Sequence, residues 1–181
     1  MKGYVMAYDV VIVVGSKDSD MEKVGASKML DVLNKVGVSW ELSVISAHRN
    51  PDELKQYIVK RANTGTLLFV GAAGMAAHLP GAIAAILGGF RPVLGVALSS
   101  SVLDGLDALL SEVRMPPGLP VGVCGIDEAG LRNAAIMACQ IVALARPQLD
   151  TKLYQYLADN NKQPAIGLLA SDQELPKREG E

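Results

Sequence analysis

The stretch Val10-Val-Ile-Val-Val-Gly-Ser-Lys-Asp-Ser-Asp20 predicts a buried parallel strand that leads directly into a polar loop. Residues 10–14 form an apolar, β-branched run without polar alternation, which is typical of a strand covered on both faces. Gly15 ends this strand, and the serines and aspartates that follow are capable helix N-caps. The stretch therefore predicts a β–loop–α unit, and the remainder of the 181-residue chain repeats that pattern.

Four more units of strand, loop and helix follow along the sequence. Further strands are expected at residues 39–45, 66–70, 92–96 and 121–125, and helices at 20–36, 51–62, 76–87, 103–113, 128–146 and 150–161. This alternation predicts an α/β fold, a three-layer doubly wound sandwich around a five-stranded parallel sheet. The commonest strand order is 2-1-3-4-5, the flavodoxin-like arrangement. We expect one domain over residues 1–165, with an extra C-terminal helix, and a loose polar tail over 166–181.

Composition and charge argue against several classes of function. The net charge of -2 gives no electrostatic reason to expect nucleic acid or an anionic membrane as a partner. Neither a membrane-spanning run nor a signal-peptide pattern is present in the sequence, so we expect a cytoplasmic protein. Cys124 and Cys139 lie in apolar surroundings and are expected to be buried free thiols. Two histidines without clustered carboxylates make a poor ligand set, so no metal site is expected.

The two histidines are the candidates for acid–base chemistry. His48 lies in Ser46-Ala-His-Arg49 and His78 in Ala76-Ala-His-Leu-Pro-Gly81, and both segments follow predicted strands. Histidine gives and takes protons near neutral pH, which makes His48 a candidate general acid or base. The alternative for His48 is a helix cap. For His78 it is a buried side chain that orients its loop through hydrogen bonds.

Three polar or glycine-rich loops follow strands 1, 2 and 3, whose carboxyl ends lie side by side in the expected order. Backbone amides and serine hydroxyls of residues 15–20 can bind an anion, and Arg49 can grip a phosphate through two hydrogen bonds. The small residues 71–74 let a ligand approach the backbone closely. Structural roles as helix caps, solvated charge and tight packing remain open for the same residues. Because ligands bind at such strand ends, we expect a binding site there.

Five motifs in a fixed order resemble one enzyme family. They are Gly15-Ser…Ser19-Asp20, Ser46-Ala-His-Arg49, Ala73-Gly-Met-Ala-Ala-His-Leu-Pro-Gly81, Pro92-Val-Leu-Gly95 and Met115-Pro-Pro-Gly-Leu-Pro120. Over about residues 10 to 146 the chain resembles the N5-carboxyaminoimidazole ribonucleotide mutases of bacterial purine biosynthesis. The related carboxylases, which use CO2 directly, typically have Lys after the Ser-Ala-His triplet and lack the Ala-Ala-His-Leu-Pro run. Arg49 and His78 therefore favour the mutases.

The resemblance implies an isomerase that moves a carboxylate from N5 to C4 of an imidazole ribonucleotide in IMP biosynthesis, with His48 as general acid/base. It implies these substrate-binding residues: Ser16, Ser19, Asp20, Ser46, Ala47, Arg49, Gly71, Ala73, Gly74, His78 and Leu79. Among them, Ser19, Ser46 and Arg49 would bind the ribose phosphate, and Asp20 the ribose hydroxyls. The family also implies no metal or organic cofactor, and a homo-octamer in which neighbouring subunits complete each site.

The sequence departs from the family pattern at three places. The first loop has one residue more than the usual Gly-Ser-x-Ser-Asp, residues 97–99 replace a more usual Pro-Val-Gln, and Arg114 stands where Gln is common. These changes leave open the direct carboxylation of aminoimidazole ribonucleotide with CO2. A non-catalytic flavodoxin-like module that binds a nucleotide or flavin is also compatible with the sequence, and so is an oligomeric scaffold.

Overall fold

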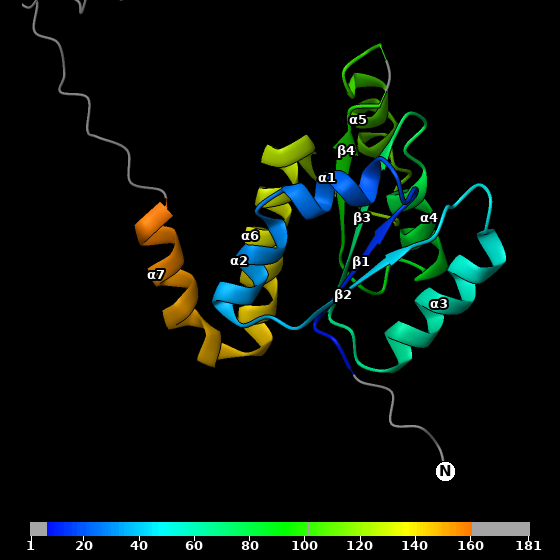
Figure 1. Ribbon diagram of the computed structural model, residues 1–181. Coiled ribbons are helices and arrows are strands. Elements are labelled where there is room, and N and C mark those ends of the chain that lie inside the picture. Colours follow the sequence, from blue (N-terminus) through cyan, green and yellow to red (C-terminus); the bar gives the residue numbers. More distant parts are fainter. Residues whose placement is uncertain (1–6, 101, 161–181) are drawn as a thin grey trace, which may run out of the picture.

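The computed structural model describes residues 7–100 and 102–160, which form a parallel five-stranded sheet between helices (Figure 1). The strands are β1 Val10–Val14, β2 Trp40–Val44, β3 Leu68–Gly74, β4 Val93–Leu98 and β5 Gly122–Ile126. Their order is β2-β1-β3-β4-β5, and every pair of neighbours is parallel. The predicted fold class and strand order are confirmed. The tail predicted at residues 166–181 lies outside the described residues.

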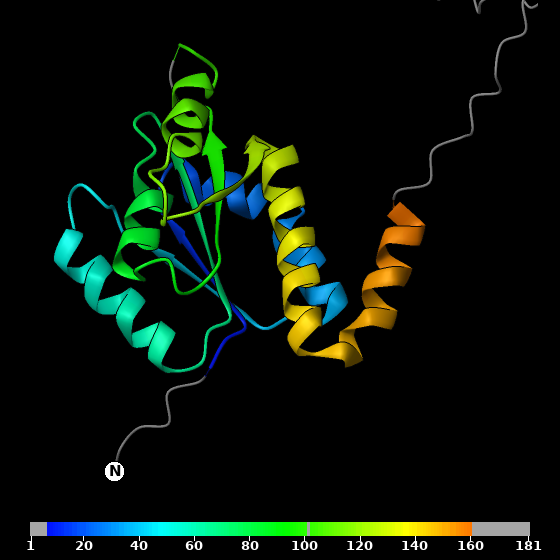
Figure 2. The same cartoon turned by 180° about the vertical axis from the view of Figure 1, so that it is seen from behind.

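Helices cover both faces of the sheet, as the opposite views of Figures 1 and 2 show. They are α1 Asp20–Ala26, α2 Met29–Val36, α3 Pro51–Asn63, α4 Leu79–Ile86, α5 Leu106–Val113, α6 Asp127–Ala145, the short turn η1 Pro147–Leu149 and α7 Asp150–Asn160. Helices α1, α2 and α6 cover one face, and α3, α4 and α5 cover the other. Helix α7 packs outside α2 and α6. Within the described ranges, no helix is both long enough and apolar enough to cross a membrane.

The residues of β1 explain why its sequence is apolar throughout. Val10, Ile12 and Val14 pack into the core beneath α2 and α6, while Val11 and Val13 pack into the core beneath α3 and α4. All five side chains are fully buried. Because successive strand residues point to opposite faces, a strand with helices on both sides has no solvent face that needs polar residues.

The single helix expected over residues 20–36 is wrong, because the chain breaks it at Ser27. Ser27 leaves the helical conformation with ψ at 163°. Its hydroxyl donates to the Val24 carbonyl at 2.8 Å and accepts from the Met29 amide at 3.2 Å. A serine hydroxyl can replace backbone hydrogen bonds in this way, which is why serine disfavours helix interiors. The apolar spacing continues across the break and hides it in the sequence.

Strand β3 runs through residues 71–74, which the sequence pattern predicts as a loop. Gly71 pairs with Gly95 of β4, and Gly74 pairs with Leu98. Glycine and alanine have weak strand propensity, but here neighbouring strands on both sides supply the hydrogen bonds. The strand therefore carries these small residues to the carboxyl edge of the sheet.

Helices α4 and α5 both begin later than the expected residues 76 and 103. A helix beginning at Ala76 would need an amide hydrogen from Pro80, which proline lacks; Pro80 instead occupies the first turn of α4. Before α5, Gly105 has a φ of +85°, a left-handed conformation that interrupts the helical path.

The core also contains a carboxyl group that makes no hydrogen bond. Glu112 on α5 is 1% exposed, and neither carboxyl oxygen has a partner in the described structure. Its side chain occupies the space that a Cβ at Gly95 would need. Burial raises the pKa of Glu112 to about 8, because the charged form is poorly solvated there. Glu112 is therefore mainly neutral at pH 7.

Neither cysteine is disulfide-bonded, and burial decides the state of both. Cys139 is buried as expected, whereas Cys124 is only partly buried. Burial raises the pKa of Cys139 to about 12, and burial together with the Glu112 charge raises the pKa of Cys124 to about 11. Both groups are thiols rather than reactive thiolates at neutral pH.

We expect Glu112→Met to stabilise the protein by an amount that grows with pH. Between pH 4.5 and about 8 the unfolded chain has released this proton while the folded chain retains it. Wild-type stability therefore falls through that window by on the order of 1.4 kcal/mol per pH unit, and methionine removes this dependence. Urea unfolding at pH 5 and pH 8 measures the difference, with the exposed Glu22→Met as control. An equal advantage at both pH values would contradict the argument.

Candidate active site

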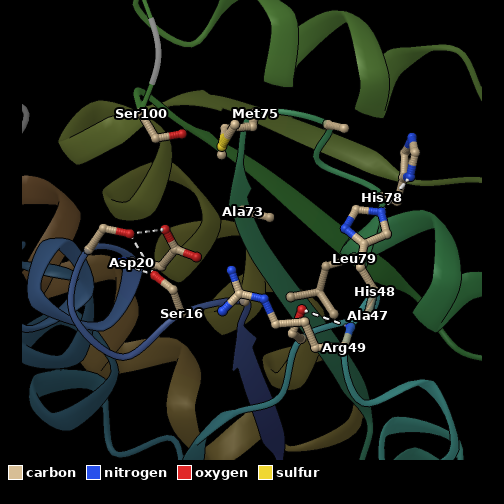
Figure 3. Close-up of a pocket in the computed structure, with 15 residues that line it drawn as sticks. Ser16, Asp20, Ala47, His48, Arg49, Ala73, Met75, His78, Leu79 and Ser100 are labelled. Atoms are coloured by element: carbon tan, nitrogen blue, oxygen red, sulfur yellow. Dashed lines mark hydrogen bonds between the residues drawn. The ribbon is translucent and has the colours of Figure 1, made fainter.

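A cavity of about 380 Å³ lies at the carboxyl ends of β1 and β3. The segment that follows β2 lines it as well. Its lining residues are Gly15, Ser16, Ser19, Asp20, Ser46, Ala47, His48, Arg49, Ala73, Gly74, Met75, Ala76, His78, Leu79 and Ser100. This volume suits a small-molecule ligand. The structure thus brings together the three loops that the sequence points to, and the segment after β4 adds Ser100 (Figure 3).

The loop after β1 is organised by its own side chains. The hydroxyls of Ser16 and Ser19 lie 2.6 Å apart, and the Ser16 hydroxyl accepts a 3.1 Å hydrogen bond from the Asp20 amide. The Ser19 hydroxyl donates to the Asp20 carboxylate at 3.0 Å. Asp20 is 6% exposed, although it lines the cavity. These bonds hold two hydroxyls and one carboxylate in fixed positions at this end of the cavity.

The segment after β2 brings a positive charge to the same end. The Arg49 amide donates to the Ser46 hydroxyl at 3.3 Å, which shapes the turn that precedes α3. Figure 3 shows the Arg49 guanidinium extending across the cavity toward Ser16 and Asp20. A guanidinium and hydroxyls facing one space form a suitable environment for a phosphate or carboxylate group.

The two histidines meet at the opposite side of the cavity. The distance from His48 Nε2 to His78 Nδ1 is 2.8 Å, and the ring centroids are 4.9 Å apart at an interplanar angle of 76°. One ring must donate and the other accept, so at least one of them is neutral while this bond exists. The alternative of a buried His78 is wrong, because both rings are exposed. His78 precedes α4, and the seating of that helix places its ring beside His48.

The floor of the cavity is the carboxyl end of β3, where side chains are small or absent. Ala73 and Gly74 line the cavity, and a Cβ at Gly74 would overlap the side chain of Ser100. Gly71 is the one predicted binding residue that does not line it. A Cβ at Gly71 would lie 3.0 Å from Pro80 Cα, so this glycine allows α4 to pack closely on β3.

Comparison with known proteins identifies the family of this fold and site. The model of the AIR carboxylase family matches residues 9–163. The chain belongs to the AIR carboxylase family.

Relatives within this family carry two different names. A protein of Pyrococcus abyssi named N5-carboxyaminoimidazole ribonucleotide mutase is 43% identical over 150 residues, which are 83% of this chain and 82% of that relative. Further relatives at about 42% identity carry the same name, which confirms the resemblance to the mutases. A phosphoribosylaminoimidazole carboxylase of Schizosaccharomyces pombe is 40% identical over 154 residues, which are 85% of this chain and 26% of that longer protein.

A solved structure of similar fold is that of Treponema denticola PurE, with a TM-score of 0.70 and 23% sequence identity. The alignment covers 84% of this chain and 90% of that one. This likeness supports the doubly wound fold of this member of the AIR carboxylase family.

Four cavity residues of this AIR carboxylase family member were not among the site residues expected from the sequence: Gly15, Met75, Ala76 and Ser100. Ser100 follows β4, so the rule that pointed to the other strand ends could have found it. Met75 has a φ of +55°, a left-handed conformation that is unfavourable for a residue with a side chain. The sequence around Met75 carries no signal of that conformation. Within the described residues, no group of three or more His, Cys, Asp or Glu side chains could hold a metal ion.

We expect Gly74→Ala to lower the free energy of unfolding by about 1–3 kcal/mol, because the added methyl group overpacks the sheet edge. The methyl group would collide with Ser100 and approach the Leu98 carbonyl oxygen to 2.8 Å. Gly25→Ala in α1 is the matched control, since no atom beyond its chain neighbours and the backbone of its own helix lies within 4 Å of its Cβ position. It should be neutral or stabilising, as alanine favours helices. Urea unfolding compares the two, and equal effects would contradict this account.

Proposed function

We propose that this protein is an N5-carboxyaminoimidazole ribonucleotide mutase, an isomerase of purine biosynthesis that yields 4-carboxyaminoimidazole ribonucleotide. The observation that carries the proposal is the division of the cavity. A histidine pair lies at one side, joined at 2.8 Å, and Arg49 extends toward the serine hydroxyls at the other. Proton transfer and anion binding are the two tasks that this substrate sets. The names of the relatives support the same reaction.

The substrate would lie with its ribose phosphate toward Arg49 and its imidazole toward His48. The Ser46 hydroxyl and Arg49 would donate hydrogen bonds to the phosphate, and the Ser19 hydroxyl, positioned by Ser16, would turn from Asp20 to donate to it as well. The carboxylate of Asp20 would then accept hydrogen bonds from the ribose hydroxyls. A carboxylate suits hydroxyl groups better than a phosphate, because like charges repel. The residues that would enclose the base and the migrating carboxylate are Ala47, Ala73, Gly74, His78 and Leu79.

The reaction breaks an N–C bond and forms a C–C bond without net change in atoms. The substrate, N5-carboxyaminoimidazole ribonucleotide, is a carbamate, because its carboxyl group is bound to the N5 nitrogen. Protonation of that nitrogen releases CO2 from the carbamate and leaves a free amine. The amine donates electron density to C4 of the imidazole, which attacks the retained CO2. Loss of the C4 proton restores the aromatic ring. The proton added in the first step equals the proton removed in the last, so one general acid/base group is sufficient.

His48 would be that group, since its ring lines the cavity and is exposed to a ligand. His78 would hold the His48 ring in position through the 2.8 Å hydrogen bond between Nε2 and Nδ1. The small residues of the β3 edge would leave room for CO2 next to C4 and limit its escape, which raises its effective concentration. The proposed chemistry requires no metal or organic cofactor, because the amine itself supplies the electron density.

We further propose a homo-octamer in which neighbouring subunits complete each cavity. Leu106, Leu110 and Val113 follow one face of α5 and are 50–53% exposed, and the preceding Leu103 is 56% exposed. Such an apolar helix face commonly packs against a partner. Light scattering should give the mass of eight subunits, and Leu110→Asp should lower it. A monomeric wild-type protein would contradict the assembly. We also propose a cytoplasmic location, because a charged phosphate substrate does not cross a lipid bilayer.

His48→Asn should greatly slow turnover while preserving ligand binding. General acid/base catalysis contributes about 10²- to 10⁴-fold, so kcat should fall within that range. Calorimetry with aminoimidazole ribonucleotide should show affinity within a few-fold of the wild type, because the phosphate-binding side chains are untouched. Near-normal turnover in the variant would remove His48 from this role, and loss of affinity would make it a binding residue instead.

Direct carboxylation is the second candidate, favoured by the carboxylase name of the Schizosaccharomyces pombe relative. A turnover assay decides between the two functions when wild-type enzyme receives either the carbamate, or aminoimidazole ribonucleotide together with bicarbonate. Faster product formation from the carbamate supports the mutase. Product formed only from the mixture of aminoimidazole ribonucleotide and bicarbonate supports the carboxylase. Binding of the ribonucleotide without any product would indicate a non-catalytic module.

A further inference from the structure

A polar cluster beside the cavity joins three elements that are far apart in the sequence. The Lys23 ammonium on α1 donates to the Ser99 hydroxyl at 2.7 Å and to the Asp127 carboxylate at 2.8 Å, and it also bonds the Ser99 carbonyl oxygen. Asp127, the first residue of α6, accepts hydrogen bonds from the Ser99 amide at 2.9 Å and from the Ser99 hydroxyl. The three side chains thus connect α1, the end of β4 and the start of α6.

Each of the three side chains in this cluster is hydrogen-bonded to the other two. The three donors of the Lys23 ammonium match its three acceptors, and the Ser99 hydroxyl both accepts and donates. Asp127 has a φ of +47°, which is unfavourable for a residue with a side chain. Burial raises its pKa, but hydrogen bonds from Lys23 and Ser99 outweigh burial and lower the pKa below its ordinary value. Asp127 therefore carries a negative charge that pairs with Lys23.

The cluster touches the cavity through its immediate neighbours. Lys23 lies one helical turn beyond Asp20, and Ser99 is bonded directly to Ser100. Asp20 and Ser100 both line the cavity, and Figure 3 shows them on the side away from the histidines. Ser100 is also held against Gly74 of β3. A shift of α1 relative to β4 would therefore change the separation of these two lining residues.

Overall stability does not account for the cluster. The side chains of Lys23 and Asp127 are 31% and 37% exposed, and ion pairs at such exposure contribute little to folding. A closed network of hydrogen bonds does, however, hold the elements that it joins, here α1, the segment after β4 and α6, in one relative position. This network also gives a structural role to Ser99, one of the positions at which the sequence departs from the family pattern.

We propose that Lys23, Ser99 and Asp127 form a positioning cluster that holds Asp20 and Ser100 at the ribose side of the cavity and thereby sets the affinity for the ribonucleotide. This inference rests on the proposed function for its substrate. Lys23 acts through α1 and Ser99, so it is a positioning residue. The histidine pair lies on other elements and is independent of the cluster.

The first test is steady-state kinetics with Lys23→Met. We expect KM for the carbamate to rise about tenfold and kcat to stay within twofold, because the ribose side loosens while the histidine pair is unchanged. Lys28→Met is the matched control, since Lys28 is an exposed lysine outside the cluster. Its KM should equal that of the wild type. An unchanged KM for Lys23→Met, or a fall in kcat alone, would overturn the proposal.

A double-mutant cycle tests whether the residues act together. Ser99→Ala should also raise KM, and the double variant should be no worse than the more impaired single variant, because either change breaks the same connection. Multiplication of the two effects to about a hundredfold would show independent contributions and would overturn the cluster as a unit.

Amide hydrogen exchange gives a readout that needs no turnover. Lys23→Met should accelerate exchange at residues 16–20 and 99–100 and leave the buried β1 amides unchanged. Acceleration throughout the chain would show a merely structural role. If wild-type protein fails to convert the carbamate, the proposed function fails, and this exchange pattern alone decides the positioning proposal. Unchanged exchange at both segments would overturn it.

Discussion

The close approach of α4 to β3 is the constraint on which the site depends. Gly71 has no side chain, so Pro80 of α4 can lie directly against the strand. That contact places His78, the residue before α4, at the carboxyl edge of the sheet, where it meets His48 from the segment after β2. A bulkier residue at position 71 would lift α4 and separate the rings. A packing contact in the core therefore determines a hydrogen bond in the cavity.

The cavity is built from side chains that bond one another before any ligand arrives. Ser16, Ser19 and Asp20 form one connected group, and the two histidines form another. Preorganised polar groups need little reorganisation when charge develops in a reaction, which is why such arrangements favour catalysis. Strand β1, beneath the serine group, is apolar and fully buried, so these polar groups stand on a rigid support. This combination explains how loops at a sheet edge can hold precise positions.

Strong local patterns made most of the fold and the place of the site predictable. The apolar run of β1 and the alternation of elements led to the sheet order, and that order brought the three loops together. What failed depended on contacts between distant residues or on single hydroxyls. The break at Ser27 comes from one side-chain hydroxyl, and the length of β3 comes from pairing with its neighbours. Likewise, nothing in the apolar run around His78 indicates that its ring faces another histidine.

The break at Ser27 has a consequence for the insertions and deletions that this chain can tolerate during evolution. In an unbroken helix, each residue added or lost turns everything beyond it by about 100° around the axis. Because α1 and α2 are separate helices, the core face of α2 can be rebuilt without rotating Asp20. The interior and the ligand-facing loop are thus insulated from each other. A residue gained or lost in one of them therefore does not rotate the other.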